Sequence, residues 1–259
     1  MAKILVIGDS CTDVHIYGTV NRLCPEAPVP ITVPVFETRN GGMAANVRDN
    51  LESLGNEVRL ITNSESIEKI RYVDKKTNQI MLRVDRGPTK LKPCENEIIH
   101  DVGYDIFDVI IISDYNKGFL TEDHICYIAK QHPLVFVDTK KLITDDMMRY
   151  VSFFKINQHE YERNLEFWKS VSNPQYSEQI KDKLIVTYGS DGCIYNDKAY
   201  KVDKVSIKDN SGAGDTFLSG LVTEYLNTGD IDKALRFANK CATVVVQQRG
   251  VVRVGDYLT

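Results

Sequence analysis

Short apolar segments alternate along most of this chain with amphipathic stretches of helical length, and this alternation constrains the fold more than any other sequence feature. Asp108–Ser113 (DVIIIS) shows the apolar type, because a continuous β-branched run is typical of a central parallel strand buried on both faces. Ala44, Val47, Leu51 and Leu54 show the second type, since apolar residues three or four positions apart form one face of a helix.

The same criteria predict strands at 3–7, 58–61, 108–113, 134–137, 152–156 and 183–187, and helices at 43–54, 121–131, 213–227 and 231–248. Gly55 and Gly229 are expected to end the first and third of these helices, and Asp230 to cap the fourth. Strands and helices that alternate in this way predict an α/β fold, a doubly wound and mostly parallel sheet flanked by helices with right-handed crossovers.

Two segments depart from this pattern. Val14–Arg39 contains strand-like stretches at 15–20 and 30–37, and Lys69–Asp85 contains two short strands around a hairpin turn at 75–78. Neither has a helix to cover it. We expect a single domain over residues 1–259, in which segments of approximately 14–39 and 69–86 form a small β-sheet lying over the main sheet as a lid. The alternative is an ordinary extension of the sheet edge.

Composition excludes several classes of protein. The formal net charge is −4 at pH 7, whereas nucleic-acid-binding proteins usually carry a basic excess. No apolar run approaches the ~20 residues that span a bilayer, and the N-terminus leads directly into a strand-like segment without a signal peptide. The six cysteines are scattered and form no C-x-x-C pair. We expect a cytoplasmic protein without a nucleic-acid or membrane partner, a disulfide frame or a metal cluster.

The sequence 209–217 (DNSGAGDTF) stands where a loop becomes a helix. The N–H groups of Gly212, Ala213 and Gly214 are expected to cradle a transferring phosphoryl group, because the first turn of a helix attracts anions. Asp215 directly after them is placed to accept the proton of a substrate hydroxyl. The helix N-terminus is expected to lower its pKa, which a loose phosphoryl-transfer transition state tolerates. Taken alone, the motif is equally compatible with a capped helix start.

A second group of polar residues follows the first strand and opens the first helix. Asp9 and Asp13 lie in the first segment, and the second (RNGGMAAN, 39–46) contains Gly41, Gly42 and Asn46. In open α/β sheets, ligands collect beyond the carboxyl ends of the strands. An acid, a Gly-Gly turn and an amide together predict a polyol site. Individually, Asp13 could be a turn residue and Asn46 a surface residue of the helix.

In their order along the chain, these segments resemble the ribokinase-like (PfkB) carbohydrate kinases, from Gly8 to about Gly250. Within that family the chain is most similar to the kinase half of bacterial D-glycero-β-D-manno-heptose 7-phosphate kinase/heptose 1-phosphate adenylyltransferases. The resemblance is carried by PEAPVP (25–30), SDYNKG (113–118), DTK (138–140), N-x-x-E (157–160), VTxGxxG (186–192) and GAGD (212–215). It implies ATP-dependent phosphorylation of a sugar hydroxyl, with O1 of a heptose 7-phosphate as the first choice of acceptor and ribose, fructose or a nucleoside as the alternative.

The resemblance also implies residue roles. The sugar would be bound by Asp13, Gly41, Gly42, Asn46 and Lys117. ATP would be bound by Asn157, Thr187, Gly189, Gly192 and Asn239. Glu160 and Asn157 would organise Mg²⁺ through water, and Asp209 with region 248–252 would hold a monovalent cation such as K⁺. A phosphorylated sugar also needs cations away from Asp215, and the candidates are Arg22, Arg39, Arg83, Lys117 and Lys140.

The chain departs from these relatives in several places. Residues 41–46 (GGMAAN) contain one residue more than the GGAAN of heptose kinases, which is closer to the spacing of ribokinases. Asn210-Ser211 stand where the family usually has threonine and glycine. Only residues 63–68 separate the strand at 58–61 from the lid, where relatives carry a further helix and strand. No adenylyltransferase portion follows Thr259, so that second activity is expected to be absent.

Other function classes fit the sequence less well. A sugar- or nucleotide-binding relative that has lost turnover would explain the trimmed segment, but a binder does not need the acid at position 215. An oxidoreductase is disfavoured because no G-x-G-x-x-G follows the first strand. Open lid strands invite pairing, so a homodimer joined through the lid is expected.

Overall fold

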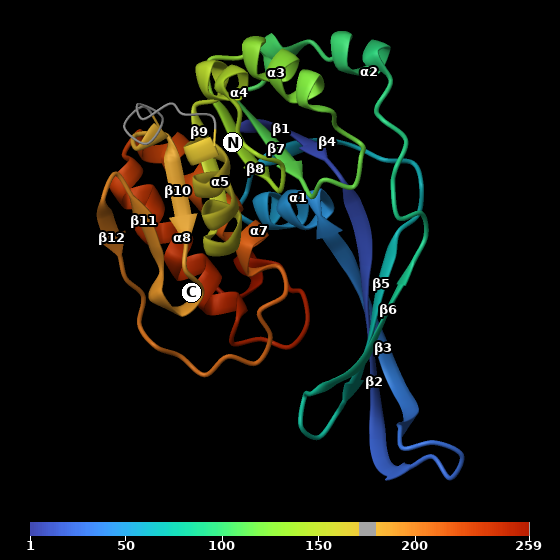
Figure 1. Cartoon of the computed structure of the whole chain (residues 1–259). Helices are drawn as coiled ribbons and strands as arrows, with labels where there is room; N and C mark the ends of the chain where they lie inside the picture. Colours follow the sequence, from blue (N-terminus) through green and yellow to red (C-terminus); the bar gives the residue numbers. More distant parts are fainter. Residues whose placement is uncertain (171–179, 259) are drawn as a thin grey trace.

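The structure, a computed structural model, describes residues 1–170 and 180–258 and contains two β-sheets (Figure 1). The larger sheet has eight strands in the order β12-β11-β10-β9-β8-β7-β1-β4. Their bounds are β1 Lys3–Gly8, β4 Glu57–Thr62, β7 Val109–Asp114, β8 Val135–Thr139, β9 Phe153–Asn157, β10 Leu184–Thr187, β11 Cys193–Tyr195 and β12 Lys198–Tyr200. All neighbouring pairs from β4 to β10 are parallel, and only β11 and β12 add antiparallel pairs.

Helices cover both faces of this sheet. One face carries α1 (Ala44–Ser53), α7 (Ala213–Thr228) and α8 (Ile231–Val245), which share a buried cluster with Ile4 and Val6 of β1. The opposite face carries α2 (Asn96–His100), α3 (Glu122–Lys130), α4 (Asp145–Tyr150) and α5 (Gln158–Ser170), and here Leu5 and Ile7 of β1 are buried. Short 3-10 turns lie at Tyr104–Ile106, Gly189–Asp191 and Val254–Asp256. No helix of the described residues is long and apolar enough to cross a bilayer.

The smaller sheet has four strands in the order β3-β2-β5-β6. They are β2 (Ser10–Leu23), β3 (Pro30–Met43), β5 (Glu68–Asp74) and β6 (Ile80–Arg86). The sequence predicts these strands, but it places the sheet over the main sheet. In the structure the base of the smaller sheet adjoins the body beside α1, while the β2–β3 hairpin reaches away from it (Figure 1). The reason is the length of β2 and β3, each of 14 residues. The β5–β6 turn also contacts the body, because Nδ2 of Asn78 donates to the Lys208 carbonyl at 2.7 Å.

The predicted strands and helices are all present, with small shifts at their ends. Gly229, with φ 63°, ends α7, and the Asp230 carboxylate accepts the N–H of Lys233 at the start of α8. The last helix ends at Val245 rather than at Gln248. The hairpin of β11 and β12 has no counterpart in the sequence prediction, because three-residue strands are too short to show periodicity.

Candidate active site

The loop before α7 presents unpaired backbone N–H groups at the start of the helix. Gly212 has φ 77°, in the left-handed region that favours glycine, and a Cβ there would lie 2.6 Å from Nδ2 of Asn46. Among the described residues, no acceptor faces the N–H groups of Gly212, Gly214 and Asp215, whereas that of Ala213 donates to the Asn210 carbonyl at 3.3 Å. The loop therefore has the geometry of an anion hole, with the amide of residue 215 in the place expected for that of residue 213.

Asp215 lies in the first turn of α7 and is only 3% exposed. Its Oδ1 accepts a hydrogen bond from the Tyr115 hydroxyl at 2.6 Å, and its Oδ2 accepts one from Nδ2 of Asn46 at 2.9 Å. Nδ2 of Asn50 donates to Oδ1 of Asn46, which orients the Asn46 amide so that its N–H₂ group faces the carboxylate. Asn46, expected to bind sugar, thus also positions the acid, and Tyr115 is a contact that the sequence analysis did not name.

The pKa of Asp215 is raised by burial to about 6. The sequence prediction of a lowered pKa is wrong. The hydrogen bonds from Tyr115 and Asn46 do stabilise the charged form, but removal of the carboxyl group from water has the larger effect. A carboxyl group with a pKa near 6 remains mostly ionised at neutral pH and is a stronger proton acceptor than an ordinary aspartate.

The sequence analysis predicts a turn at Gly41 and Gly42, and this prediction is wrong. Both glycines belong to strand β3 and pair with β2. A Cβ on Gly42 would lie 2.1 Å from Oδ2 of Asp13, so the missing side chain lets this carboxylate lie against the β3 backbone. The turn into α1 occurs at Met43, whose φ is 62°. The glycines therefore shape the surroundings of Asp13 through close packing rather than through a loop.

Asp13 forms a buried ion pair with Arg71 of β5. The two residues are 6% and 8% exposed, so the pair lies inside the base of the smaller sheet. Burial raises the pKa of the Cys11 thiol to about 11, and the nearby carboxylates of Asp13 and Asp215 contribute to this rise. The Cys11 thiol therefore lies near both acids.

Asp9, grouped with Asp13 in the predicted polyol site, is fully buried. Its two oxygens accept the N–H groups of Lys117 at 3.1 Å and Phe119 at 3.3 Å. Asp9 therefore holds the loop that carries Tyr115 and is a positioning residue. On the same loop, the Lys117 side chain has no ion-pair partner among the described residues.

Two lysines contact the ring of Tyr115. Nζ of Lys69, on β5, lies 5.3 Å from the ring centroid, and Nζ of Lys140 lies 4.7 Å from it. Lys140 also donates to Oε1 of Glu160 at 2.8 Å. The Tyr115 ring thus links the smaller sheet, the α/β body and the carboxylate of Asp215.

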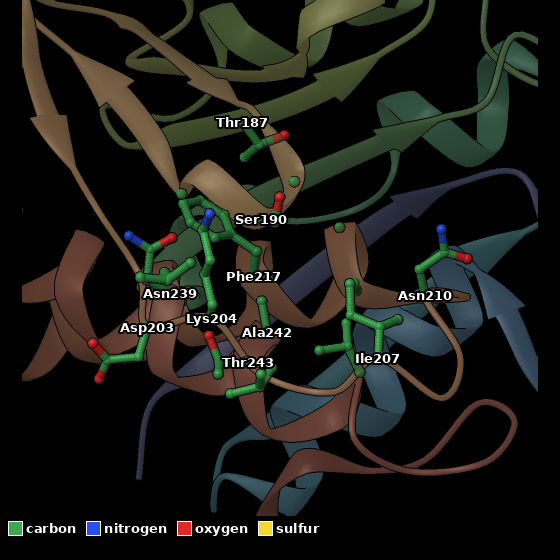
Figure 2. Close-up of a pocket in the computed structure, with 17 residues that line it drawn as sticks. Thr187, Ser190, Asp203, Lys204, Ile207, Asn210, Phe217, Asn239, Ala242 and Thr243 are labelled. Atoms are coloured by element: carbon green, nitrogen blue, oxygen red, sulfur yellow. The ribbon is translucent and has the colours of Figure 1, made fainter.

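A cavity of about 490 Å³ opens between the β10–β12 region and helices α7 and α8 (Figure 2). Of the residues expected to bind ATP, it is lined by Thr187, Gly189, Gly192 and Asn239, but not by Asn157. The amide of Asn239 is engaged in the fold, because its Nδ2 donates to the Tyr200 carbonyl at 2.8 Å. Much of the remaining wall is apolar, from Val202, Val205, Ile207, Phe217, Ala242 and Val246.

The same cavity reaches the start of α7, since Ala213 and Gly214 line it. An apolar region that is continuous with a row of free amides suits a ligand with a flat base at one end and phosphates at the other. The cavity therefore brings the predicted nucleotide residues and the anion hole into one site.

Asn157 and Glu160 form two reciprocal hydrogen bonds at the end of β9. The N–H of Glu160 donates to Oδ1 of Asn157 at 2.9 Å, and the N–H of Asn157 donates to Oε2 of Glu160 at 2.8 Å. Burial opposes ionisation of Glu160, but the Asn157 N–H and the Lys140 ammonium hold its pKa below the usual range. Among the described residues no three acidic, histidine or cysteine side chains are grouped to ligate a metal. One ionised carboxylate fits Mg²⁺ held through water.

Asp209 lies beside the base of the smaller sheet. Its Oδ1 accepts the N–H of Ser211 at 2.8 Å, and its Oδ2 accepts the N–H of Gly250 at 3.2 Å. Nε2 of His15, on β2, is 3.7 Å from Oδ2. The structure thus brings Asp209 and region 248–252 together, as the resemblance implies, and adds a histidine to this group.

A buried pair behind the anion hole was missed by the sequence analysis. Nζ of Lys155, on β9, donates to Oδ2 of Asp138, on β8, at 2.7 Å, and the residues are 5% and 8% exposed. Although burial disfavours its charge, Asp138 holds the Lys155 pKa above the usual value. Lys155 sits in an apolar strand (FFKIN), where a single lysine gives no periodic signal.

Comparison with known proteins gives consistent results. The family model described as pfkB family carbohydrate kinase matches residues 106–254. The chain is 32% identical to the bifunctional protein HldE of Helicobacter pylori, over 96% of this chain and 64% of that protein. It is 31% identical to the same-named protein of Campylobacter jejuni, over 97% of this chain and 62% of that protein. The chain therefore spans less than two thirds of the length of these relatives.

Solved structures with the same fold are similar over nearly the whole chain. Phosphofructokinase-2 from Escherichia coli, solved in complex with potassium, matches with a TM-score of 0.74 and 15% identity, over 99% of this chain and 96% of that chain. Ribokinase from Thermotoga maritima matches with a TM-score of 0.72 and 15% identity, over 100% and 96% of the two chains. At such low identity, these likenesses show the fold alone.

Proposed function

Because the chain belongs to the pfkB family of carbohydrate kinases, whose model matches more than half of it, we propose that it phosphorylates O1 of a heptose 7-phosphate with ATP. The single observation that carries this mechanism is the position of Asp215. A buried carboxylate stands beside free amides, at the end of a cavity of about 490 Å³. A phosphotransferase needs these groups to meet where an alcohol approaches a terminal phosphate.

In this mechanism Asp215 accepts the proton of the acceptor hydroxyl. The hydroxyl oxygen bonds to the γ-phosphorus while the bond to the β,γ-bridging oxygen breaks, and ADP leaves. The amides of Gly212, Gly214 and Asp215 stabilise the negative charge on the transferring group. Asn46 and Tyr115 keep the carboxylate aimed, and each Asp215 oxygen retains a lone pair for the acceptor.

The proposal that the acceptor carries a phosphate is supported by two lysine side chains near Tyr115 that form no ion pair with a described residue. Among the described residues, Lys69 and Lys117 form no ion pair with a carboxylate, although the charges of both act on Asp85 of β6. The other candidates are less available. Arg39 pairs with Glu37 and Glu68, Arg83 with Asp85 and Lys140 with Glu160, while Arg22 lies exposed on the outer part of β2. Lys69 and Lys117 would hold the acceptor's existing phosphate.

The nucleotide is ATP in this proposal, with its base in the apolar part of the cavity and its phosphates toward Gly214. Asn157 and Glu160 would hold Mg²⁺ through water, and the ion would neutralise charge on the phosphates. Asp209 would hold a monovalent cation through the lone pairs left by Ser211 and Gly250. Turnover should be abolished by EDTA and should be higher in KCl than in choline chloride of equal ionic strength.

A panel of acceptors in an ADP-release assay tests the substrate. Heptose 7-phosphate, ribose, fructose, fructose 6-phosphate and adenosine are compared at equal concentration, and the product is identified by ³¹P NMR. We expect turnover with heptose 7-phosphate and a new phosphate at O1. Turnover with ribose but none with heptose 7-phosphate would overturn the choice of sugar. A binding protein would be favoured instead if, for every acceptor of the panel, the wild-type chain released ADP no faster than Asp215→Asn.

The smaller sheet is also proposed as the contact of a homodimer. Its edge strands β3 and β6 carry exposed apolar side chains, namely Val33, Val35, Ile80 and Leu82. Apolar side chains on open strands are the kind of surface that a second copy covers. Light scattering on the purified chain should give twice the mass of 29.4 kDa.

A further inference from the structure

The Lys155–Asp138 pair lies directly behind the anion hole. A Cβ built on Gly214 would be 2.9 Å from Nζ of Lys155, so the glycine is what allows the ammonium to approach the first turn of α7. Among the described residues, the only hydrogen-bond acceptor of this ammonium is Oδ2 of Asp138. An ammonium has three N–H donors. Two therefore remain available for a ligand.

The surroundings of Lys155 are those of a reaction centre rather than of a core ion pair. Besides Asp138, its charge interacts with the carboxylates of Asp215 and Glu160. Lys155 therefore lies near both the acid beside the anion hole and the acid expected near Mg²⁺. Gly214, its neighbour, lines the nucleotide cavity. An anion seated against the free amide of Gly214 would meet this ammonium on its other side.

We propose that Lys155 is a catalytic residue whose ammonium contacts the γ-phosphoryl group in the anion hole, with Asp138 orienting it from behind. This inference rests on the proposed kinase function. The amides carry only partial charges, whereas Lys155 brings a full positive charge to the transferring group. Asp138 keeps the side chain in place when no nucleotide is bound, because a lone buried ammonium would be unfavourable.

The test compares two nucleotides that differ only in the γ-phosphate. Isothermal titration measures the affinity for ADP and for AMP-PNP, with and without Mg²⁺, so that the result does not depend on any acceptor. Lys155→Met should weaken AMP-PNP binding roughly 10- to 100-fold, the size expected for a charged hydrogen bond, and change ADP binding less than about threefold. Equal losses for both nucleotides, or no loss, would overturn the proposal.

Asp138→Asn is the second variant. It should change the preference for AMP-PNP over ADP in the direction opposite to that of Lys155→Met. This variant keeps the ammonium but removes its counter-charge, so the preference for AMP-PNP over ADP should increase. If the pair only stabilises the fold, both variants should lower the melting temperature and leave the ratio of the two affinities unchanged. The Asp138→Asn measurement decides the question even if Lys155→Met fails to fold.

Lys183→Met is the matched control. This lysine is half-buried and donates to the carbonyls of Met148 and Val151, at a distance from the cavity lining. It should lose stability without changing the ratio of ADP and AMP-PNP affinities. Wild-type protein that binds AMP-PNP selectively through Lys155 but phosphorylates no sugar would refute the proposed kinase function, while the contact of Lys155 with the γ-phosphate would stand.

Discussion

The α/β body and the smaller sheet differ in how far their strands are buried. β1 and β7 of the body are buried along nearly their whole length because helices cover both faces. β3 of the smaller sheet is exposed over much of its length and becomes buried only at Gly42 and Met43, where it meets the body. Packing on two sides makes the body rigid, whereas the smaller sheet, which contacts the body at its base and through Asn78, has fewer contacts that oppose movement.

The candidate site is divided between these two regions. Asp215, the free amides and the nucleotide cavity belong to the body, where a fixed geometry favours catalysis. Asp13 and Arg71 belong to the base of the smaller sheet, where, under the proposed function, movement would allow an acceptor to enter and leave. We therefore expect body variants to lose the chemical step, base variants to lose acceptor binding, and variants of the outer sheet to affect association.

The largest effect is expected in the body, for Asp215→Asn. It should lower kcat by at least ~10²-fold and leave AMP-PNP affinity nearly unchanged, because it removes a proton acceptor without altering the cavity. Its melting temperature should equal or exceed that of wild type, since the neutral amide replaces a buried charge. Asp256→Asn, an exposed acid paired with Arg253, is the control and should behave as wild type. Unchanged kcat in Asp215→Asn would remove this residue from the mechanism.

The pH dependence sharpens the same comparison, because it reports on a group in the body. The acid must be ionised to accept a proton, so kcat/KM should rise about tenfold per pH unit below about 6 and then level off. The contribution of this group to the free energy of unfolding should change in the opposite direction and fall as pH rises. A raised carboxyl pKa contributes stability that is fully present below the unfolded pKa of about 4 and is lost as pH rises through about 6. In Asp215→Asn this part of the stability profile should disappear.

At the base of the smaller sheet, Asp13→Asn should raise the KM for the acceptor roughly 10- to 100-fold, the loss expected for a hydrogen bond to a charged group. The KM for ATP should change little, because the nucleotide cavity lies in the body. Glu37→Gln is the matched control, an exposed acid of the same sheet that pairs with Arg39. A larger change in the KM for ATP than in that for the acceptor would contradict the division of the site.

The smallest effect on activity is expected in the outer sheet. Val33 and Val35 are 57% and 53% exposed and lie two residues apart on edge strand β3. The double variant Val33→Thr/Val35→Thr should be monomeric by light scattering, with kcat within a few-fold of wild type. Ile106→Thr, at an equally exposed apolar position of the body, should remain dimeric. A wild-type chain that is monomeric at assay concentrations would contradict the proposed dimer.

Local patterns predicted most of the fold. The parallel strands of the body, helices α1, α3, α7 and α8, and the four strands of the smaller sheet were predictable because hydrophobic periodicity and glycine positions act within a few residues. Helices α2, α4 and α5 and strands β11 and β12 were not predicted. The turn of the DNSGAGD segment was also predictable, since it depends on adjacent residues, although the free amide of Asp215 stands where that of Ala213 was expected. The direction in which the smaller sheet extends was not predictable from the sequence, because it depends on the packing of the long strands β2 and β3 against the body.

The contacts that complete the site were less accessible to sequence analysis. Tyr115 reaches Asp215 across 100 positions of the chain, and Arg71 reaches Asp13 across 58. Lys155 has no local pattern around it at all. The sign of the Asp215 pKa shift was mispredicted for the same reason. The helix N-terminus is a local feature, whereas burial depends on everything that packs around the carboxyl group.

The sequence alone therefore determined the type of sheet, the place of the anion-binding turn and the identity of the acid beside it, because each follows from short-range spacing. Tertiary structure alone decided which side chains hold that acid, how readily it takes a proton and which cation stands behind the amides. These properties depend on distances between strands and helices and on the exclusion of water, and neither quantity exists until the chain has packed.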